Sequence, residues 1–116
     1  MHRAICNMIQ IEAAPGVIAM HIPNGGKRGN AEAGRLRSMG TQAGAPDLLV
    51  IVAGRAHGLE IKTEAGRLSV VQKRMAERFR HAGCAYEVAR SVEGARRHLA
   101  TWGALDQPIA TLECAT

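Results

Sequence analysis

Residues 46–62 read PDLLVIVAGRAHGLEIK, and their pattern combines a strand hairpin with three charged side chains. The apolar run 48–52 is typical of a strand, the segment 54–58 of a turn, and residues 59–63 of a returning strand. Strand residues two apart point to the same face, so Glu60 and Lys62 share a face and Ile61 points to the other. If the two strands pair, Asp47 at the start of the first lies beside Glu60 at the end of the second.

Two carboxylates and one ammonium group in this arrangement can hold a hard divalent cation and a water beside a phosphodiester. We expect Asp47 and Glu60 to bind Mg²⁺ or Mn²⁺ through their oxygens, with the Ile61 carbonyl as a third ligand. Lys62 would position the water or stabilise the charged phosphate. Each residue alone also has a structural explanation, as a turn residue, an exposed strand residue or one half of a cross-strand pair.

Length and charge restrict the class of protein. The 116 residues predict one domain, 1–116, and 15 Lys and Arg against 10 Asp and Glu give a net charge of +5, which favours a polyanion partner. Aromatic residues are scarce, with Phe79, Tyr86 and Trp102 as the whole supply, which argues against a stacking platform for single strands. Duplex or branched DNA, bound through its backbone, fits better.

No motif predicts a small-molecule cofactor, a zinc site or a membrane segment. Cys6, Cys84 and Cys114 are odd in number and far apart, so we expect free thiols in a cytoplasmic protein. The start of the chain lacks the apolar core of a signal peptide, and no apolar run approaches membrane-spanning length. The stretch 25–27, Gly-Gly-Lys, does not have P-loop spacing.

The remaining pattern predicts a mixed sheet flanked by helices, which is an α/β fold. Ahead of the hairpin, we expect a helix over 3–13, a strand over 17–22 and a short helix over 31–39. After it, we expect a helix from a capping box at Ser69 to about residue 82, a strand over 84–89 and a helix over 92–102. The core would span about 3–101, and a tail over 103–116 would pack loosely or serve assembly.

Several polar residues outside the hairpin allow two interpretations. Gln72 completes the capping box with Ser69, which explains it fully, but a role beside the carboxylates is compatible with that. Glu64 would be a solvated strand end or an added ligand. The turn and basic loop after the first strand, with the following helix, would contact DNA phosphates through Asn24, Lys27, Arg28, Arg35 and Arg37.

Four blocks in order, HIPNGG at 21–26, GAPDL at 44–48, GLEIK at 58–62 and GRLSVVQ at 66–72, resemble the VRR-Nuc domain, a branch of the PD-(D/E)XK nuclease superfamily. The resemblance covers about residues 3–101 and implies a restriction-endonuclease-like fold with metal-dependent phosphodiester cleavage that leaves a 5′-phosphate and a 3′-hydroxyl. By the same resemblance, Asp47 and Glu60 match metal ligands, Lys62 the catalytic lysine, and Gln72 the glutamine that follows.

Small free-standing proteins of this kind are similar to homodimeric enzymes that act on branched DNA such as four-way (Holliday) junctions, in a bacterial or phage-infected cell. One feature departs from the family: its usual first-helix glutamate would fall at or before the start of this chain. Glu12 is the only acid on the predicted first helix, and it comes later than that position.

The departure leaves three explanations open: a site built from Asp47, Glu60 and water, a site in which Glu12 substitutes, or a shortened first helix. It also motivates an alternative function, a non-enzymatic protein that binds branched DNA with an incomplete metal site. A second alternative is a small α/β interaction module in which the motif is accidental.

Overall fold

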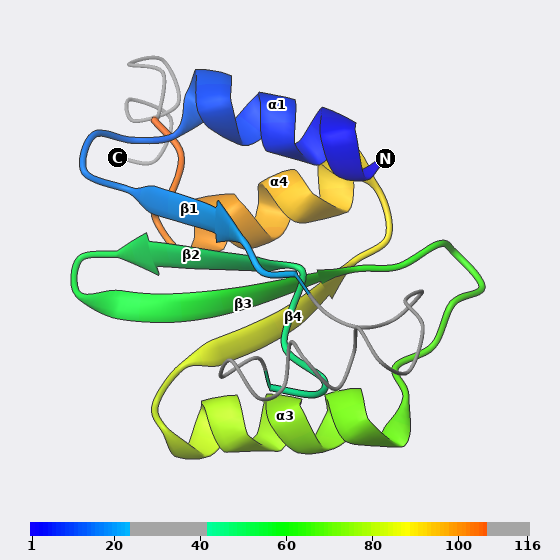
Figure 1. Cartoon of the computed structure of the whole chain (residues 1–116). Coiled ribbons are helices and arrows are strands. Elements are labelled where there is room, and N and C mark those ends of the chain that lie inside the picture. Colours follow the sequence, from blue (N-terminus) through cyan, green and yellow to red (C-terminus); the bar gives the residue numbers. More distant parts are fainter. Residues whose placement is uncertain (24–41, 107–116) are drawn as a thin grey trace.

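A four-stranded mixed sheet forms the centre of the fold (Figure 1). The structure is a computed structural model that describes residues 1–23 and 42–106. The strands lie in chain order: β1 (Ile18–His21), β2 (Leu48–Val52), β3 (Arg55–Ile61) and β4 (Ala85–Ala89). Neighbours β1–β2 and β2–β3 are antiparallel, whereas β4 runs parallel to β3. The α/β class and the mixed sheet predicted from the sequence are therefore confirmed.

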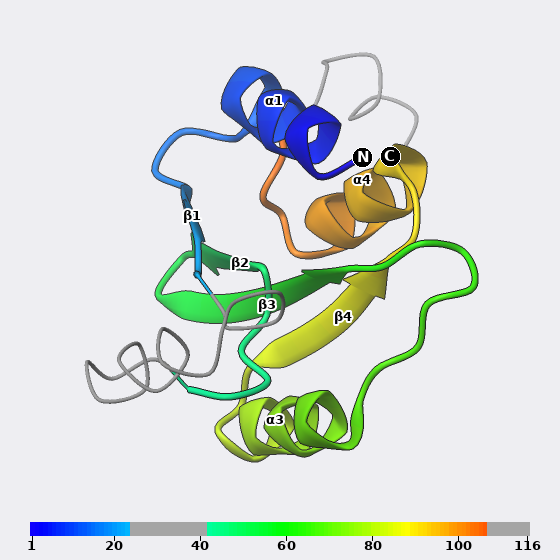
Figure 2. The same cartoon turned by 45° about the vertical axis from the view of Figure 1, so that its right-hand side comes forward.

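Helices cover both faces of the sheet, as Figures 1 and 2 show. Helices α1 (His2–Glu12) and α4 (Val92–Thr101) lie on one face, and α3 (Val70–His81) lies on the other. The larger apolar cluster fills the space between α1, α4 and the sheet, and the smaller one lies under α3 around Met75, Ala76 and Tyr86. None of the helices in the described ranges is long and apolar enough to cross a membrane.

The helices begin and end where local chemistry predicts. Pro15 and Gly16 follow α1, and Gly16 has a φ of 85° that favours glycine. Ser91 caps α4, because its side-chain oxygen accepts a hydrogen bond from the Gly94 N–H at 2.9 Å. The two final helices, at 70–81 and 92–101, confirm the helices predicted from Ser69 to about residue 82 and over 92–102.

The hairpin turn predicted over 54–58 is wrong. Strand β3 already begins at Arg55, which pairs with Val52, so only Ala53 and Gly54 form the turn. Both have positive φ values, 50° and 78°, as a two-residue type I′ turn requires. The two glycines at 54 and 58 suggested a longer loop, but Gly58 lies within the strand.

Gly58 is needed for close packing rather than for a turn. A Cβ atom at this position would lie 2.9 Å from Pro46 Cγ and 3.0 Å from Phe79 Cε2. Since real Cβ atoms do not approach other heavy atoms so closely, the strand can pass beneath Pro46 and α3 only with glycine here.

The core extends beyond the predicted limit at residue 101. Ala104 and Leu105 are buried, and Leu105 forms an isolated antiparallel bridge with Ala13 at the end of α1. The Ala14 N–H donates to the Ala104 carbonyl at 2.8 Å. The first residues of the predicted tail are thus packed, because they carry apolar side chains back to α1. The predicted helix over 31–39 and residues 107–116 lie outside the described residues.

Candidate active site

The register of the central hairpin brings Asp47 and Glu60 together. Leu48 is opposite Leu59, so the residues just beyond them face each other where β2 begins and β3 ends. The Asp47 N–H donates to Glu60 Oε1 at 3.2 Å, and the Ile61 N–H donates to Asp47 Oδ2 at 2.8 Å. These reciprocal bonds hold two carboxylates side by side, as the sequence predicts.

Lys62 adds an ammonium group to the pair. The backbone N–H of Lys62 donates to the Ala89 carbonyl at 3.0 Å. This bond continues the β3–β4 ladder one residue past β3 and fixes the lysine backbone. Its Nζ lies 3.5 Å from Glu60 Oε2. Glu60 is only 3% exposed, whereas the Lys62 side chain is 22% exposed, so the cation is the member of this pair that solvent reaches.

Gln72, on the first turn of α3, has both roles that the sequence allowed. Its Oε1 accepts from the Ser69 N–H at 2.9 Å, and Ser69 Oγ accepts from the Gln72 N–H at 3.1 Å, which completes the capping box. Its Nε2 donates to Glu60 Oε2 at 2.8 Å. One side chain therefore joins the start of α3 to the buried carboxylate.

Burial and repulsion raise the pKa of Glu60 to about 7. Desolvation is the main cause and the Asp47 charge adds to it, while Lys62 and the Asp47 N–H lower the pKa in part. The same centre raises the pKa of Tyr86, first through burial and then through the Glu60 and Asp47 charges. The Asp47 charge therefore influences the ionisation of Glu60 and Tyr86 at this end of the hairpin.

On α1, the Cys6 thiol responds to the Asp47 charge. Burial raises the pKa of the Cys6 thiol, and the Asp47 charge raises it further. Glu12 lies six residues further along α1, about 9 Å away along the helix axis, where its carboxylate forms an ion pair with Arg96 of α4. The structure therefore places Glu12 at the C-terminal end of α1, where it pairs with Arg96.

Two residues that the sequence analysis did not select support the site. The Arg90 guanidinium donates to the carbonyls of Thr63 at 2.8 Å, Glu64 at 3.3 Å and Gly66, so it holds the loop that follows Lys62. The Tyr86 hydroxyl donates to the Gly44 carbonyl at 3.2 Å and fixes the turn before Asp47. Both contacts join residues far apart in the sequence, so no local sequence pattern predicts them.

Other predicted residues lie apart from the carboxylates or cannot be placed. Glu64 is exposed, but it lies in the loop after β3, which ends at Ile61, rather than at a strand end. The predicted DNA contacts lie outside the described residues: Asn24, Lys27, Arg28, Arg35 and Arg37. Within residues 1–23 and 42–106, no group of three or more His, Cys, Asp or Glu side chains is arranged to hold a metal ion.

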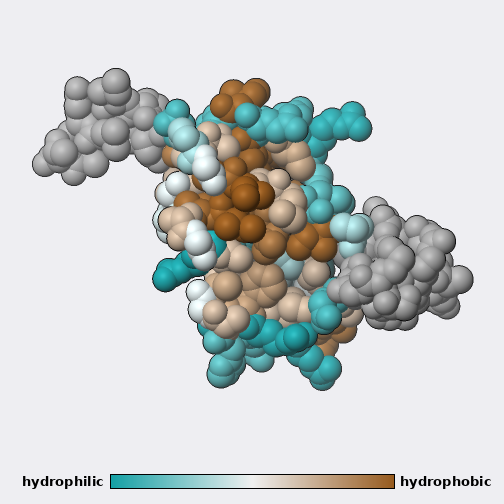
Figure 3. Space-filling model, turned by 60° about the vertical axis from the view of Figure 1, so that its left-hand side comes forward, coloured by the Kyte–Doolittle hydropathy of each residue, from teal (hydrophilic) through white to brown (hydrophobic). Residues whose placement is uncertain are grey.

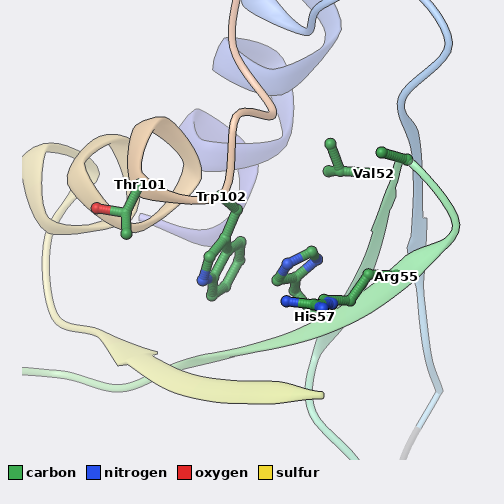
Figure 4. A pocket seen from close by; sticks show the side chains of 6 residues that line it. Val52, Arg55, His57, Thr101 and Trp102 are labelled. Atoms are coloured by element: carbon green, nitrogen blue, oxygen red, sulfur yellow. The ribbon is translucent and has the colours of Figure 1, made fainter. Parts of the chain in front are cut away.

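A cavity of about 420 Å³ opens on the opposite face of the sheet, near the hairpin turn (Figure 4). Its lining includes Arg55, His57 and Trp102, and the His57 and Trp102 rings stack with centroids 4.7 Å apart. His57 Nδ1 hydrogen-bonds to the Val50 carbonyl at 3.1 Å. Because His57 and Glu60 are three residues apart on one strand, they point to opposite faces, and this cavity is separate from the carboxylates.

No protein-family model matches the chain, and no curated protein matches it. Among solved structures, one described as a VRR_NUC domain protein superposes with a TM-score of 0.70, at 22% identity over 86% of this chain and 82% of the other. A second, described as a VRR_NUC domain, gives a TM-score of 0.57 at 23% identity over 83% and 86%.

The chain has the VRR-Nuc fold. At this level of identity the likeness concerns the fold, and it confirms the fold that the four sequence blocks suggested. Within the VRR-Nuc fold of this chain, the blocks GAPDL, GLEIK and GRLSVVQ contribute the three elements that meet at Glu60: the start of β2, the end of β3 and the start of α3.

Proposed function

We propose that this protein is a metal-dependent, structure-selective DNA endonuclease that hydrolyses phosphodiester bonds in branched DNA such as four-way junctions. It would act as a homodimer in the cytoplasm of a bacterial or phage-infected cell. The observation that carries the proposal is the convergence of Asp47, Glu60 and Lys62 at one end of the hairpin. The VRR-Nuc fold supports it, because both similar structures are described by that domain name.

The donor set fits Mg²⁺ or Mn²⁺. Asp47 and Glu60 supply carboxylate oxygens. The Ile61 N–H donates to Asp47, and a strand residue turns its carbonyl to the same edge as its N–H, which supports the Ile61 carbonyl as a third ligand. Oxygen ligands of this kind favour a hard cation. A bound cation would neutralise charge on the scissile phosphate and lower the pKa of a water molecule.

The chain's own groups orient the reactants. Gln72 and the Asp47 N–H each hold one oxygen of the Glu60 carboxyl, which restricts its rotation. Lys62, the more exposed partner of the pair, would place its ammonium group against the attacking water or the phosphate oxygens. Because the Lys62 ammonium group lies 3.5 Å from Glu60 Oε2, we assign it positioning and charge stabilisation rather than proton abstraction.

A polyanion substrate agrees with the charge of the whole chain. The net charge of +5 attracts DNA, and twelve of the fifteen cations are Arg, which forms bidentate phosphate contacts. Asn24, Lys27, Arg28, Arg35 and Arg37 are proposed as backbone contacts.

A second candidate function is a branched-DNA-binding protein without catalysis. The observation that favours it is that no three His, Cys, Asp or Glu side chains in residues 1–23 and 42–106 are grouped to hold a metal ion, while Glu12, the acid of α1, pairs with Arg96. Under this alternative the fold and the DNA affinity persist while the cation affinity is too weak for turnover.

The deciding experiment incubates the purified protein with a labelled four-way junction, a linear duplex and a single strand, in Mg²⁺, Mn²⁺ or EDTA. Metal-dependent cutting of the junction that is lost in Asp47→Ala and retained in Glu64→Ala, the matched removal of an exposed nearby carboxylate, supports the nuclease. Junction binding without cutting in either metal supports the second candidate. Calorimetric titration with Mn²⁺ separates the two further, because only the nuclease has a site that Asp47→Ala removes.

A further inference from the structure

Among residues 1–23 and 42–106, β1 forms an edge of the sheet, and its side chains are unusually exposed for an apolar strand. Within the described residues, β1 pairs only with β2. All four residues, Ile18 to His21, are exposed, with Ile18 at 52% and Met20 at 46%. None of the four is a lysine, an acidic residue or a proline. Residues of these kinds normally block strand addition at a sheet edge.

The backbone register shows which groups the edge offers. The Ile22 N–H donates to the Asp47 carbonyl at 2.8 Å, and these two residues continue the β1–β2 register. Hydrogen-bonded pairs alternate with non-hydrogen-bonded pairs along an antiparallel ladder. The backbone groups of Met20 and Ile18, two and four residues before Ile22, therefore also form hydrogen bonds with β2. Ala19 and His21 therefore turn their N–H and C=O groups to the open side, where they can pair with another strand.

An apolar patch accompanies this edge on the face that α3 leaves partly uncovered. Ile18 pairs with Ile51 and Met20 with Leu49, and paired residues share a face. With Ala56, these residues form the patch, whose hydrophobic side chains gather over the strands in Figure 3. A cavity of about 250 Å³ adjoins it, lined by Leu49 and Ala56 of the patch together with Met75, Arg78, Phe79, Ala82 and Cys84.

A second copy of this chain fits the patch better than DNA does. The patch has no charged side chain, so it offers no electrostatic attraction to a polyanion. Each copy has a net charge of +5, but at this face two copies would place no like charges against each other. The open edge is also self-complementary, because a strand that pairs antiparallel with its own copy satisfies the same groups on both sides. Such an isologous contact closes at two subunits.

We infer that two copies pair antiparallel through β1, with Met20 opposite Met20 of the partner subunit at the two-fold axis. Ala19 then exchanges both backbone bonds with His21 of the partner subunit, and the two sheets become one continuous sheet. The apolar patches lie next to each other on the same face. This inference rests on the homodimer of the proposed function and adds where the two subunits contact each other. The interface includes none of the catalytic residues.

The test measures the molar mass of the protein by sedimentation over micromolar concentrations. We expect twice 12.4 kDa for the natural chain. Ala19→Pro removes an N–H that faces the open side, so it spares the β1–β2 ladder and blocks pairing with a partner. Ala19→Pro and Met20→Lys should each raise the dimer dissociation constant by about a hundredfold or more. Ile11→Lys, at an 82% exposed apolar residue outside the patch, should not change it.

A cross-link checks the register directly. Opposed residues in a non-hydrogen-bonded pair have Cα atoms about 4.5 Å apart, which a disulfide can span. Met20→Cys, with the three natural cysteines changed to serine, should form a covalent dimer on oxidation, and Ile11→Cys in the same background should not.

A natural chain that sediments as a monomer overturns the interface and the homodimer together. A dimer that survives Ala19→Pro and Met20→Lys overturns the interface alone, and junction cleavage, measured separately, reports on the nuclease.

Discussion

Glu60 is the residue on which the site depends. Each of its carboxyl oxygens has a protein donor, Asp47 N–H on one and Gln72 Nε2 on the other, with the Lys62 ammonium group nearby. Leaving such a buried group unpaired would cost a few kcal/mol. Its surroundings were partly predictable, because the spacing of Asp47, Glu60 and Lys62 on two adjoining strands implies that they meet. Glu60 is only 3% exposed and contacts Gln72 at the start of α3, a burial that no local sequence pattern indicates.

The pKa of Glu60 predicts how stability depends on pH. The pKa is 4.5 ordinarily and about 7 in the folded chain, so between these values the folded state keeps a proton that the unfolded state has released. The free energy of unfolding should therefore fall as the pH rises from about 4.5 to about 7, by at most about 3 kcal/mol, and then level off. Urea denaturation in EDTA measures this. Glu60→Gln should lack the fall, and an equal fall in that variant would assign it to other groups.

Lys62→Ala should abolish cleavage and leave DNA binding nearly unchanged. The ammonium group would act on the reacting phosphate or water, so its loss should lower kcat by about a hundredfold or more. One cation among fifteen contributes little to the affinity for DNA. Single-turnover cleavage and a binding titration check the two parts, with Lys73→Ala, an exposed lysine on α3, as the control. Full turnover by Lys62→Ala would remove this residue from the mechanism.

At the scale of elements, the start of α3 serves both folding and the site. Ser69 and Gln72 form a complete capping box, and the same Gln72 side chain reaches Glu60. The capping box could be predicted from Ser-Val-Val-Gln at 69–72, and so could most of the helix and strand positions. The short hairpin turn could not, because Gly58 suggested a loop and only the packing of Pro46 and Phe79 explains its place in a strand.

Two substitutions separate the capping role of this element from its contact with Glu60. Ser69→Ala should lower the free energy of unfolding by about 1 kcal/mol, because α3 loses its N-cap, and should leave cleavage nearly unchanged. Gln72→Ala should cost a similar amount of stability and also lower kcat, since Glu60 loses a hydrogen-bond donor. Urea denaturation and cleavage rates measure both effects. Equal cleavage rates in the two variants would show that Gln72 acts only as a cap.

At the scale of the whole molecule, the sheet divides the chain into two sides with different tasks. Helices α1 and α4 cover one face and contribute most of the buried apolar side chains. On the other face, α3 leaves room for the carboxylates at one end of the hairpin and for the apolar patch at the free edge. This division could not be read from the sequence, because it depends on strand order and on which face each helix packs against.

The charge of the whole chain predicts a salt-dependent affinity for DNA. Several phosphate contacts should make binding to the four-way junction about a thousandfold weaker at 200 mM than at about 50 mM salt. Fluorescence anisotropy over this range measures the slope, with EDTA present to prevent cutting. A flat dependence on salt would favour the interaction module instead, because a binding surface for another protein needs no such release of counterions.

Gly58 has a consequence for how the protein can evolve. The atoms that exclude a side chain there belong to Pro46, which precedes the first carboxylate, and to Phe79 of the helix that carries Gln72. A single methyl group at position 58 would push both away from the sheet, and with them two of the groups that meet at Glu60. Homologues that keep the arrangement of Asp47, Glu60 and Gln72 should therefore tolerate change at neighbouring exposed positions of β3 long before they tolerate any side chain at position 58.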